Sequence, residues 1–263
     1  MNIVAAALAA MSVYAPADDR GQSGTRASVA PARVHAVAPA LAAYTDDVLF
    51  GEVWERSELS KRDRSLVTVS ALVAGGHTEQ MQGHFGRSID NGVTPTELSG
   101  VITHLAFYAG WPRAMSAVSV ANAVLSERGL TPIIVPDGLT AVDKAADAPR
   151  ARSVETSVGP VAPALANYTN GVLFDDLWRR ADLAPRDRSL VTVVALIANG
   201  QAEQMPFHLN RAMDNGLTQV EVGEIITHLA FYAGWPRAMS AVAVAEDVFK
   251  ARDAAAEPDS PQQ

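Results

Sequence analysis

One histidine in the chain shares a helical stripe with other polar side chains. Gln80, His84 and Arg87 are spaced i, i+4 and i+7, so in a helix they lie on one face. An imidazole beside an amide and a guanidinium could hold an anionic substrate and move a proton. Glu79 lies about 140° around the helix from the histidine and offers a carboxylate. The same spacing also suits a polar seam between packed helices, and spacing alone leaves both interpretations open.

A second histidine lies on an aromatic stripe further along the chain. His104 and Tyr108 are spaced i and i+4, and Trp111 follows within the next turn. These residues are candidates for binding a substrate, although aromatic stripes at helical spacing more often belong to a protein core. Trp54 and Trp178 are expected in the core or at an interface.

Each of these groups occurs twice because the chain contains an internal duplication. Residues 37–124 align with residues 161–248 at a constant offset of 124, without a gap, and 56 of the 88 positions are identical. Chance does not produce a match of this length. The candidate residues of the second copy are therefore Glu203, Gln204, His208, Arg211, His228, Tyr232 and Trp235.

The duplication also predicts the domain organisation. The segment between the copies is rich in proline, glycine and other small residues, as linkers are. Residues 3–15 form a short apolar run with an A-x-A-like end, typical of a secretory signal peptide, although no Lys or Arg precedes it. Export is thus slightly favoured over a cytoplasmic location. We expect an N-terminal tail over 1–36 with a possible signal peptide over 1–17, domains over 37–128 and 161–252, a linker over 129–160 and a disordered tail over 253–263.

The local patterns within each copy predict helices. Ser60 and Asp63 resemble a capping box, and Thr94 to Glu97 form a stronger helix start with proline at the first helical position. Gly92 is suited to a helix end, and Gly110 to Pro112 mark the next helix boundary. No alternating strand pattern competes with these features. The predicted fold class is all-α, with about five or six helices in each copy.

Composition and charge exclude several classes of protein. The formal charge is −8 and no basic cluster occurs, so we expect no nucleic-acid partner. No stretch reaches the length of a membrane span, so we expect no membrane partner. The chain has no cysteine, which excludes thiol peroxidase chemistry, disulfide exchange and thiolate metal sites. No metal-ligand spacing occurs either, and His77 is replaced by Gln201 in the second copy.

The run Arg62-Asp63-Arg64 opens a helix in the first copy. Its simplest interpretation is an exposed helix start with local charge pairing. Arg62 and its equivalent Arg186 could also line the mouth of a pocket.

Taken together, the motifs resemble a carboxymuconolactone decarboxylase domain. The resemblance rests on Arg62 to Thr68, Glu79 to Met81 with His84, Asn91 to Thr94 with Glu97, and His104 to Ala114. It covers about 88 residues in each copy. It implies an all-α fold of the alkylhydroperoxidase D-like type, no cofactor, and a homo-oligomer, for which three tandem chains could rebuild a hexamer of domains. The peroxidase branch of that superfamily carries C-x-x-C where this chain has His77 and Gln80.

The resemblance also implies a reaction, the decarboxylation of a small carboxylated lactone. The lactone can delocalise the electrons that departing carbon dioxide leaves behind, so no cofactor is needed. We expect Arg87 and Arg62 to bind carboxylates, and His84 to stabilise an oxyanion or protonate carbon. Glu79 would orient the histidine or donate a proton. In the second copy His208, Arg211, Arg186 and Glu203 would act alike. A non-catalytic binding or assembly protein and, less favoured without cysteine, a residual hydroperoxidase are the alternatives.

Overall fold

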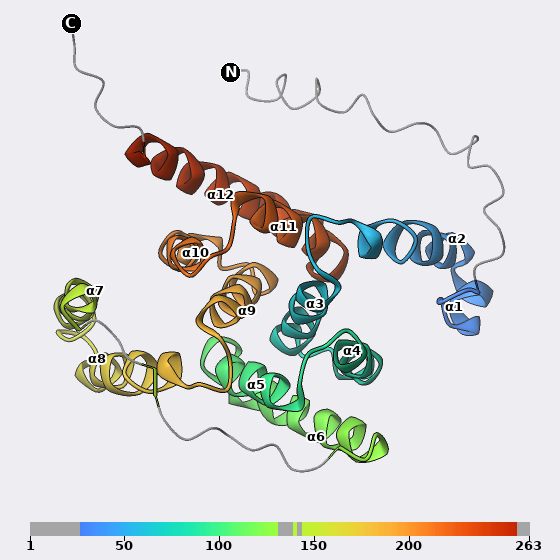
Figure 1. Ribbon diagram of the computed structural model, residues 1–263, viewed down its shortest axis with the longest axis horizontal. Coiled ribbons are helices and arrows are strands. Elements are labelled where there is room, and N and C mark those ends of the chain that lie inside the picture. The colour runs from blue at the N-terminus through green and yellow to red at the C-terminus, as the bar shows by residue number, and fades with distance from the viewer. Residues whose placement is uncertain (1–26, 131–138, 141–143, 257–263) are drawn as a thin grey trace, which may run out of the picture. The chain divides into compact units, whose positions relative to one another are not determined.

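The computed structural model describes residues 27–130, 139–140 and 144–256, and these are almost entirely helical (Figure 1). Twelve α-helices occur in the described part of the chain, where Leu139 and Arg180 form an isolated bridge but no named strand is present. The all-α prediction is therefore confirmed. No described helix is long and apolar enough to cross a membrane.

Each copy contributes five α-helices, as predicted. The unit that ends at Glu52 holds α1 (Ala32–Val37), α2 (Pro39–Ala43) and a π-helical segment (Tyr44–Leu49). The unit that starts at Val53 holds the rest of both copies. From the first copy these are a 3₁₀ turn (Val53–Glu55), α3 (Lys61–Gly75), α4 (Thr78–Asp90), α5 (Pro95–Ala109) and α6 (Trp111–Glu127). Helix α7 (Lys144–Ser157) lies between the two copies. The α-helices of the second copy are α8 (Pro163–Tyr168), α9 (Pro185–Ala198), α10 (Met205–Asp214), α11 (Gln219–Ala233) and α12 (Trp235–Ala256). The second copy also contains a π-helical segment (Thr169–Phe174) and two 3₁₀ turns (Leu177–Arg179 and Ala202–Gln204).

The helix ends follow the local signals in the sequence. Ser60 caps α3 by accepting a hydrogen bond from the Asp63 backbone N–H at 3.0 Å. Thr94 and Glu97 form a complete capping box at the start of α5, and Thr218 and Glu221 repeat it at α11. Gly92 has a φ of 97°, which ends the preceding helix in the left-handed region that favours glycine.

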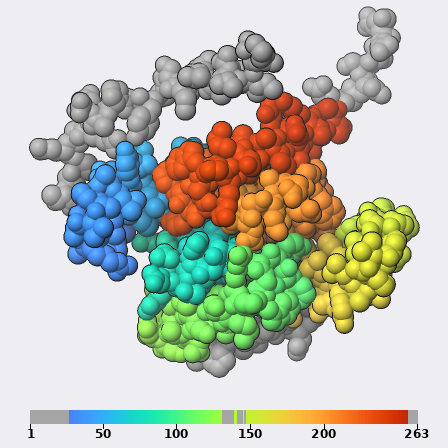
Figure 2. All heavy atoms as spheres, turned by 180° about the vertical axis from the view of Figure 1, so that it is seen from behind, coloured from blue at the N-terminus to red at the C-terminus, as the bar shows by residue number. Residues whose placement is uncertain are grey.

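Both copies contribute residues to one hydrophobic core. Within the unit that starts at Val53, α3 packs against α9 and α11, and α5 packs against α9. The core cluster includes Leu66 and Leu105 from the first copy together with Leu190 and Leu229 from the second. Figure 2 shows the second copy in orange and red lying directly on the teal and green helices of the first. The sequence copies are thus repeats of one pattern that fold together.

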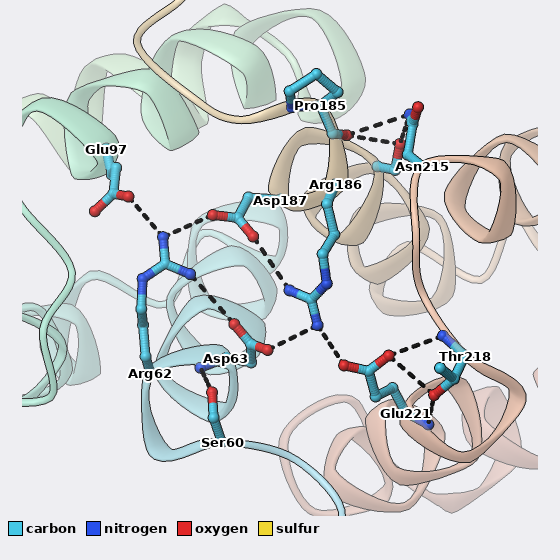
Figure 3. A network of polar contacts seen from close by, with 11 residues as sticks. Ser60, Arg62, Asp63, Glu97, Pro185, Arg186, Asp187, Asn215, Thr218 and Glu221 are labelled. Carbon is cyan, nitrogen blue, oxygen red and sulfur yellow. Dashed lines mark hydrogen bonds and ion pairs between the residues drawn. The ribbon is translucent and has the colours of Figure 1, made fainter.

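Charged side chains at the start of α3 and α9 join the copies across this contact (Figure 3). Arg62 bonds to Asp187 of the other copy and to Glu97, each at 2.6 Å. Arg186 makes the equivalent bonds to Asp63 at 2.9 Å and to Glu221. We call these six residues the junction network.

The expectation of an exposed helix start over Arg62 to Arg64 is wrong. Asp63 is 6% exposed and Arg64 is fully buried. The physical reason is the contact between α3 and α9, which covers the first turn of both helices and supplies opposite charges from the partner copy.

Three segments that were predicted to be irregular contain helix. The linker predicted over 129–160 includes α7, which is held by the ion pair of Arg150 with Asp147 at 2.6 Å and by the Arg150 guanidinium 3.8 Å above the Phe174 ring. Residues 253–256 of the predicted disordered tail continue α12, because its alanines favour helix. Helix α1 begins within the predicted N-terminal tail. The possible signal peptide lies outside the described residues.

We expect Asp187→Asn to lower the free energy of unfolding by about 3 kcal/mol. The substitution removes a buried carboxylate that pairs with the guanidinium groups of both Arg62 and Arg186. Urea-induced unfolding measures the loss. Asp90→Asn is the matched control, since the Asp90 side chain is 62% exposed and solvent screens its ion pair with Arg128. Equal losses in the two variants would contradict a stabilising junction network.

Candidate functional site

Two aromatic clusters each combine residues of both copies. The His84 cluster is defined by Trp54, His84 and Arg87 of the first copy with His228 and Tyr232 of the second. The His208 cluster is defined by the equivalent Trp178, His208, Arg211, His104 and Tyr108. The chain therefore carries two clusters of the same composition, and neither copy supplies a whole cluster.

The geometry of the two clusters is nearly identical. His84 stacks on Trp54 at 6.2 Å between ring centroids, and its edge meets the Tyr232 ring at 5.5 Å. In the other cluster the same distances are 6.0 Å, from His208 to Trp178, and 5.4 Å, from His208 to Tyr108. The second histidine of each cluster stacks on its tyrosine, at 5.0 Å for His228 with Tyr232 and 4.8 Å for His104 with Tyr108.

Each cluster combines residues of both copies because α11 packs on α3 and α5 packs on α9. Helix α4 places His84 and Arg87 on one face, as the i and i+3 spacing requires. Helix α11 presents His228 and Tyr232 one turn apart, so both rings face the residues of the first copy. Trp54 comes from the short 3₁₀ turn before α3 and is buried.

Hydrogen bonds fix the tautomer of the second histidine in each cluster. Thr68 donates its single hydroxyl proton to the Arg64 carbonyl at 2.9 Å. The 2.9 Å contact between Thr68 Oγ1 and His228 Nε2 must therefore use a proton on the ring. His228 is thus the Nε2–H tautomer, with a lone pair on Nδ1. That Nδ1 atom is buried, and the described residues give it no hydrogen-bond partner.

The second cluster supports the same assignment. Thr192 donates to the Arg188 carbonyl at 2.9 Å and contacts His104 Nε2 at 2.7 Å. Arg188 Nη1 lies 3.4 Å from His104 Nδ1. A guanidinium has only donors, so Nδ1 must be the acceptor.

Burial keeps the imidazoles and phenols of both clusters neutral. Burial first, and then the nearby Arg87 or Arg211, lower the pKa of His84 and of His208 to about 4. Burial, followed by Arg64, lowers the pKa of His228 to about 3. The pKa of His104 falls well below its usual value for the same main reason.

The tyrosines are shifted in the opposite direction. Burial raises the pKa of Tyr108 and of Tyr232 to about 12, although a hydrogen bond from tryptophan opposes the rise. In each cluster the tryptophan Nε1–H donates to the tyrosine oxygen at 2.9 Å. The phenol therefore keeps its own proton as a donor. At neutral pH each cluster consists of uncharged rings beside one arginine.

A fully buried arginine lies behind each second histidine, and the copies neutralise it differently. Arg64 pairs with Glu224 of the other copy at 2.8 Å. Arg188 pairs instead with Asp182 of its own copy at 2.9 Å. The position equivalent to Glu224 is Gly100, where a Cβ would lie 3.1 Å from the Asp182 carbonyl oxygen. The carboxylate that pairs with the buried arginine thus comes from α11 for Arg64 and from the turn before α9 for Arg188.

The structure brings together only part of the predicted site. The members it unites are His84, Arg87, His104, Tyr108, His208, Arg211, His228 and Tyr232, with the pairing exchanged between copies. Glu79, Gln80, Glu203 and Gln204 are exposed at or before the first turn of α4 and α10. Trp111 and Trp235 are more than half exposed and pack on Phe107 and Phe231. Arg62 and Arg186 belong to the junction network.

Sequence reasoning did not identify several residues of the clusters. Trp54 and Trp178, expected in a core or interface, stack on the histidines. Arg64 and Thr68 and their equivalents Arg188 and Thr192 were not singled out. Their identical repetition within Arg62 to Val69 was the available signal. The described residues contain no group of three or more His, Asp or Glu that could hold a metal ion.

We expect the free energy of unfolding to fall as the pH drops from about 6.5 towards 5. Below pH 6.5 the unfolded chain protonates its histidines, whereas the folded chain keeps four of them neutral, so the unfolded state binds more protons. Each of the four histidines lowers the free energy of unfolding by roughly 1–2 kcal/mol by pH 5. Denaturant titrations across this range measure the slope.

The control is a double variant, His84→Gln with His208→Gln. It should keep only about half of the pH dependence, because His104 and His228 remain. An unchanged slope would show that His84 and His208 do not resist protonation in the folded state.

The parts of the chain that resemble known proteins include the residues of both clusters. The model of the carboxymuconolactone decarboxylase family matches residues 39–123 and 163–247. A 4-carboxymuconolactone decarboxylase of Acinetobacter baylyi is 37% identical over 84 residues, which are 32% of this chain and 63% of the relative. Nitrosuccinic acid decarboxylase npaB of Metarhizium robertsii is 30% identical over 78 residues, which are 30% of this chain and 54% of the relative.

The aligned segments thus span less than two thirds of either relative. The two segments that match the family model, in contrast, together cover more than half of this chain. The chain belongs to the carboxymuconolactone decarboxylase family and carries the family domain twice.

Proposed function

We propose that the protein is a cofactor-independent carboxy-lyase that acts on a small carboxylated lactone, of the kind formed in aromatic-compound degradation. The observation that carries the proposal is the repeated cluster, in which one guanidinium lies beside neutral imidazoles and a phenol. Both relatives described above are decarboxylases by name, and one of them acts on 4-carboxymuconolactone.

The chemistry requires binding and charge stabilisation rather than a covalent catalyst. The bond between the ring carbon and its carboxylate breaks, and carbon dioxide leaves without the bonding electrons. Those electrons delocalise through the ring double bond onto the lactone carbonyl oxygen. A proton then returns to a ring carbon, which restores the neutral lactone. The protein must therefore hold a carboxylate, stabilise an oxyanion and deliver one proton.

In each cluster the arginine is the group suited to a substrate carboxylate. Arg87 lies 5.5 Å from the Trp54 ring centre, and Arg211 lies 4.4 Å from that of Trp178. A guanidinium keeps its charge in such partly buried surroundings and binds carboxylates through two parallel N–H donors. We assign carboxylate binding to Arg87 and Arg211, and not to Arg62 and Arg186, whose N–H groups are occupied in the junction network.

The neutral rings are suited to stabilising the oxyanion. His84 and His208, with pKa values of about 4, carry one N–H each at neutral pH and can donate it to a developing negative charge. Tyr232 and Tyr108 supply an O–H donor next to the same imidazole. Aromatic walls keep water away, which strengthens these hydrogen bonds.

The proton that returns to carbon has two candidate sources. The tyrosine hydroxyl is the donor within the cluster, because a carbanion-like intermediate is basic enough to take a proton from a phenol. Glu79 and Glu203 remain candidates at the surface, as exposed carboxyl groups near the start of α4 and α10. Tyr232→Phe with Tyr108→Phe, compared with Glu79→Gln with Glu203→Gln, separates the two sources by which pair loses turnover.

Turnover of enzymatically generated 4-carboxymuconolactone by the full chain, without added metal or cofactor, tests the proposal. In each single variant, His84→Gln or His208→Gln, the cluster that keeps its histidine should remain active. The double variant should lose at least about 100-fold in kcat. His77→Gln is the matched control, because His77 is exposed and the second copy already has glutamine there.

Two results would count against the lyase. No turnover in the wild type would favour a non-catalytic binding protein on the same scaffold, consistent with the purely structural bonds of His104 and His228 to threonine. Full activity in the double histidine variant would show that the chemistry takes place elsewhere in the chain.

We also propose that the chain assembles as a homo-oligomer, with three tandem chains as the expected number. Equivalent apolar grooves of about 480 and 530 Å³ lie between α5 and α6 and between α11 and α12. Beside them Trp111, Met115, Trp235 and Met239 are each more than half exposed. Large exposed apolar patches of this kind mark association surfaces.

Light scattering is expected to give a mass of three times the 27.8 kDa chain. Met115→Glu with Met239→Glu should release single chains, because a charge on an apolar interface is costly to bury. Ser116→Glu, at an exposed polar position of α6, is the control and should leave the mass unchanged. A wild-type protein that is a single chain in solution would contradict the assembly.

A further inference from the structure

We propose that the two clusters admit ligands of different size, and that the residue before the first histidine sets the difference. That residue is Gly83 in the His84 cluster and Phe207 in the His208 cluster. The size preference for substrates rests on the proposed function, whereas the difference in access to the histidines does not.

The shared rings of the two clusters have matched geometry and do not distinguish the clusters. The histidine–tryptophan and histidine–tyrosine ring distances in the two clusters agree within a few tenths of an ångström. The hydrogen bond from tryptophan to tyrosine is 2.9 Å in both. Any difference in what the clusters admit must therefore arise around them and not from their shared rings.

Phe207 adds an aromatic wall to the His208 cluster. Its ring meets His208 edge-on at 5.0 Å and an interplanar angle of 82°. It also packs against Phe174 at 6.3 Å, and Phe174 stacks on Trp178 at 6.1 Å. Phe207 is 47% exposed, so the ring stands at the edge of the cluster with one part in solvent.

Further contacts hold this wall in place. The guanidinium of Arg150 lies 3.8 Å from the Phe174 ring centre, and that of Arg211 lies 5.3 Å from it. Arg211 is thus flanked by the rings of Phe174 and Trp178. A carboxylate that binds Arg211 must fit beside these rings, and Phe207 closes the side next to His208.

Gly83 leaves the equivalent space open. A Cβ built at this residue meets no atom within 4 Å. The glycine is therefore not required by close packing, and helix α4 would be more stable with alanine at this point. An unoccupied position beside His84 accommodates the part of a ligand that Phe207 would exclude from the other cluster.

Labelling with diethyl pyrocarbonate, which acylates unprotonated imidazole, tests access directly. Burial lowers the pKa of His84 and of His208 to about 4, so both imidazoles are unprotonated at pH 7. Mass spectrometry of peptides from the full chain gives the two rates in one molecule. We expect His84 to react about threefold or more faster than His208, a modest difference in barrier.

Reciprocal variants assign the difference to one position. Phe207→Gly and Phe207→Ala should raise the rate at His208 towards that at His84, and Gly83→Phe should lower the rate at His84. Gly83→Ala is the matched control, because a methyl group in open space should leave the ratio unchanged. The histidine of the unaltered cluster is an internal reference, since unfolding would speed the labelling of both.

Equal rates in the wild type, or a ratio that the exchanged residues do not move, would overturn the proposal. Protection by succinate and by benzene-1,3-dicarboxylate then tests size. The aromatic acid should protect His84 better than His208, and Gly83→Phe should remove this preference, whereas succinate should protect both. If neither acid protects either histidine while the labelling ratio responds to the variants, the carboxylate site of the proposed function is wrong and the difference in access stands.

Discussion

The rest of the structure depends on the ion pairs that the first turns of α3 and α9 form with each other. Asp63 and Asp187 are buried at this contact, and each needs a guanidinium from the opposite copy. A buried carboxylate without its partner costs several kcal/mol. Neither copy can therefore neutralise its own buried aspartate, and the first turns of α3 and α9 must pack against each other. The glutamates of the capping boxes, Glu97 and Glu221, complete the network and tie α5 and α11 to the same contact.

The composite clusters are a consequence of that packing. Once α3 lies on α9, helix α11 reaches Thr68 of the first copy and helix α5 reaches Thr192 of the second. Each threonine hydroxyl donates its proton to a carbonyl one turn earlier in its helix, so the facing imidazole must donate from Nε2. Burial keeps that histidine neutral. The cation in each cluster is then the arginine of α4 or α10, the group best suited to a substrate anion.

The sequence predicted the helices well because their signals are local. Caps at Ser60 and Thr94 and the glycine stop at Gly92 depend only on neighbouring residues. It also placed His84 and Arg87 on one face. The pairing of His84 with Tyr232 could not be predicted, because identical copies leave it open whether a stripe meets its own copy or the other. The same ambiguity hid the burial of Arg64, whose charge is neutralised by Glu224 from a distant helix.

Duplication within one chain lets two equivalent sites diverge, which identical subunits cannot do. Glu224 pairs with Arg64 behind the His84 cluster, while the equivalent Gly100 lies against Asp182 near the other cluster. Because each cluster draws on both copies, a substitution in either copy can alter either cluster. The buried ion pairs illustrate such a difference, as Arg64 pairs with Glu224 on α11 and Arg188 pairs with Asp182 in the turn before α9. The two clusters thus share the buried charge balance and the uncharged rings, and differ in the residues that surround them.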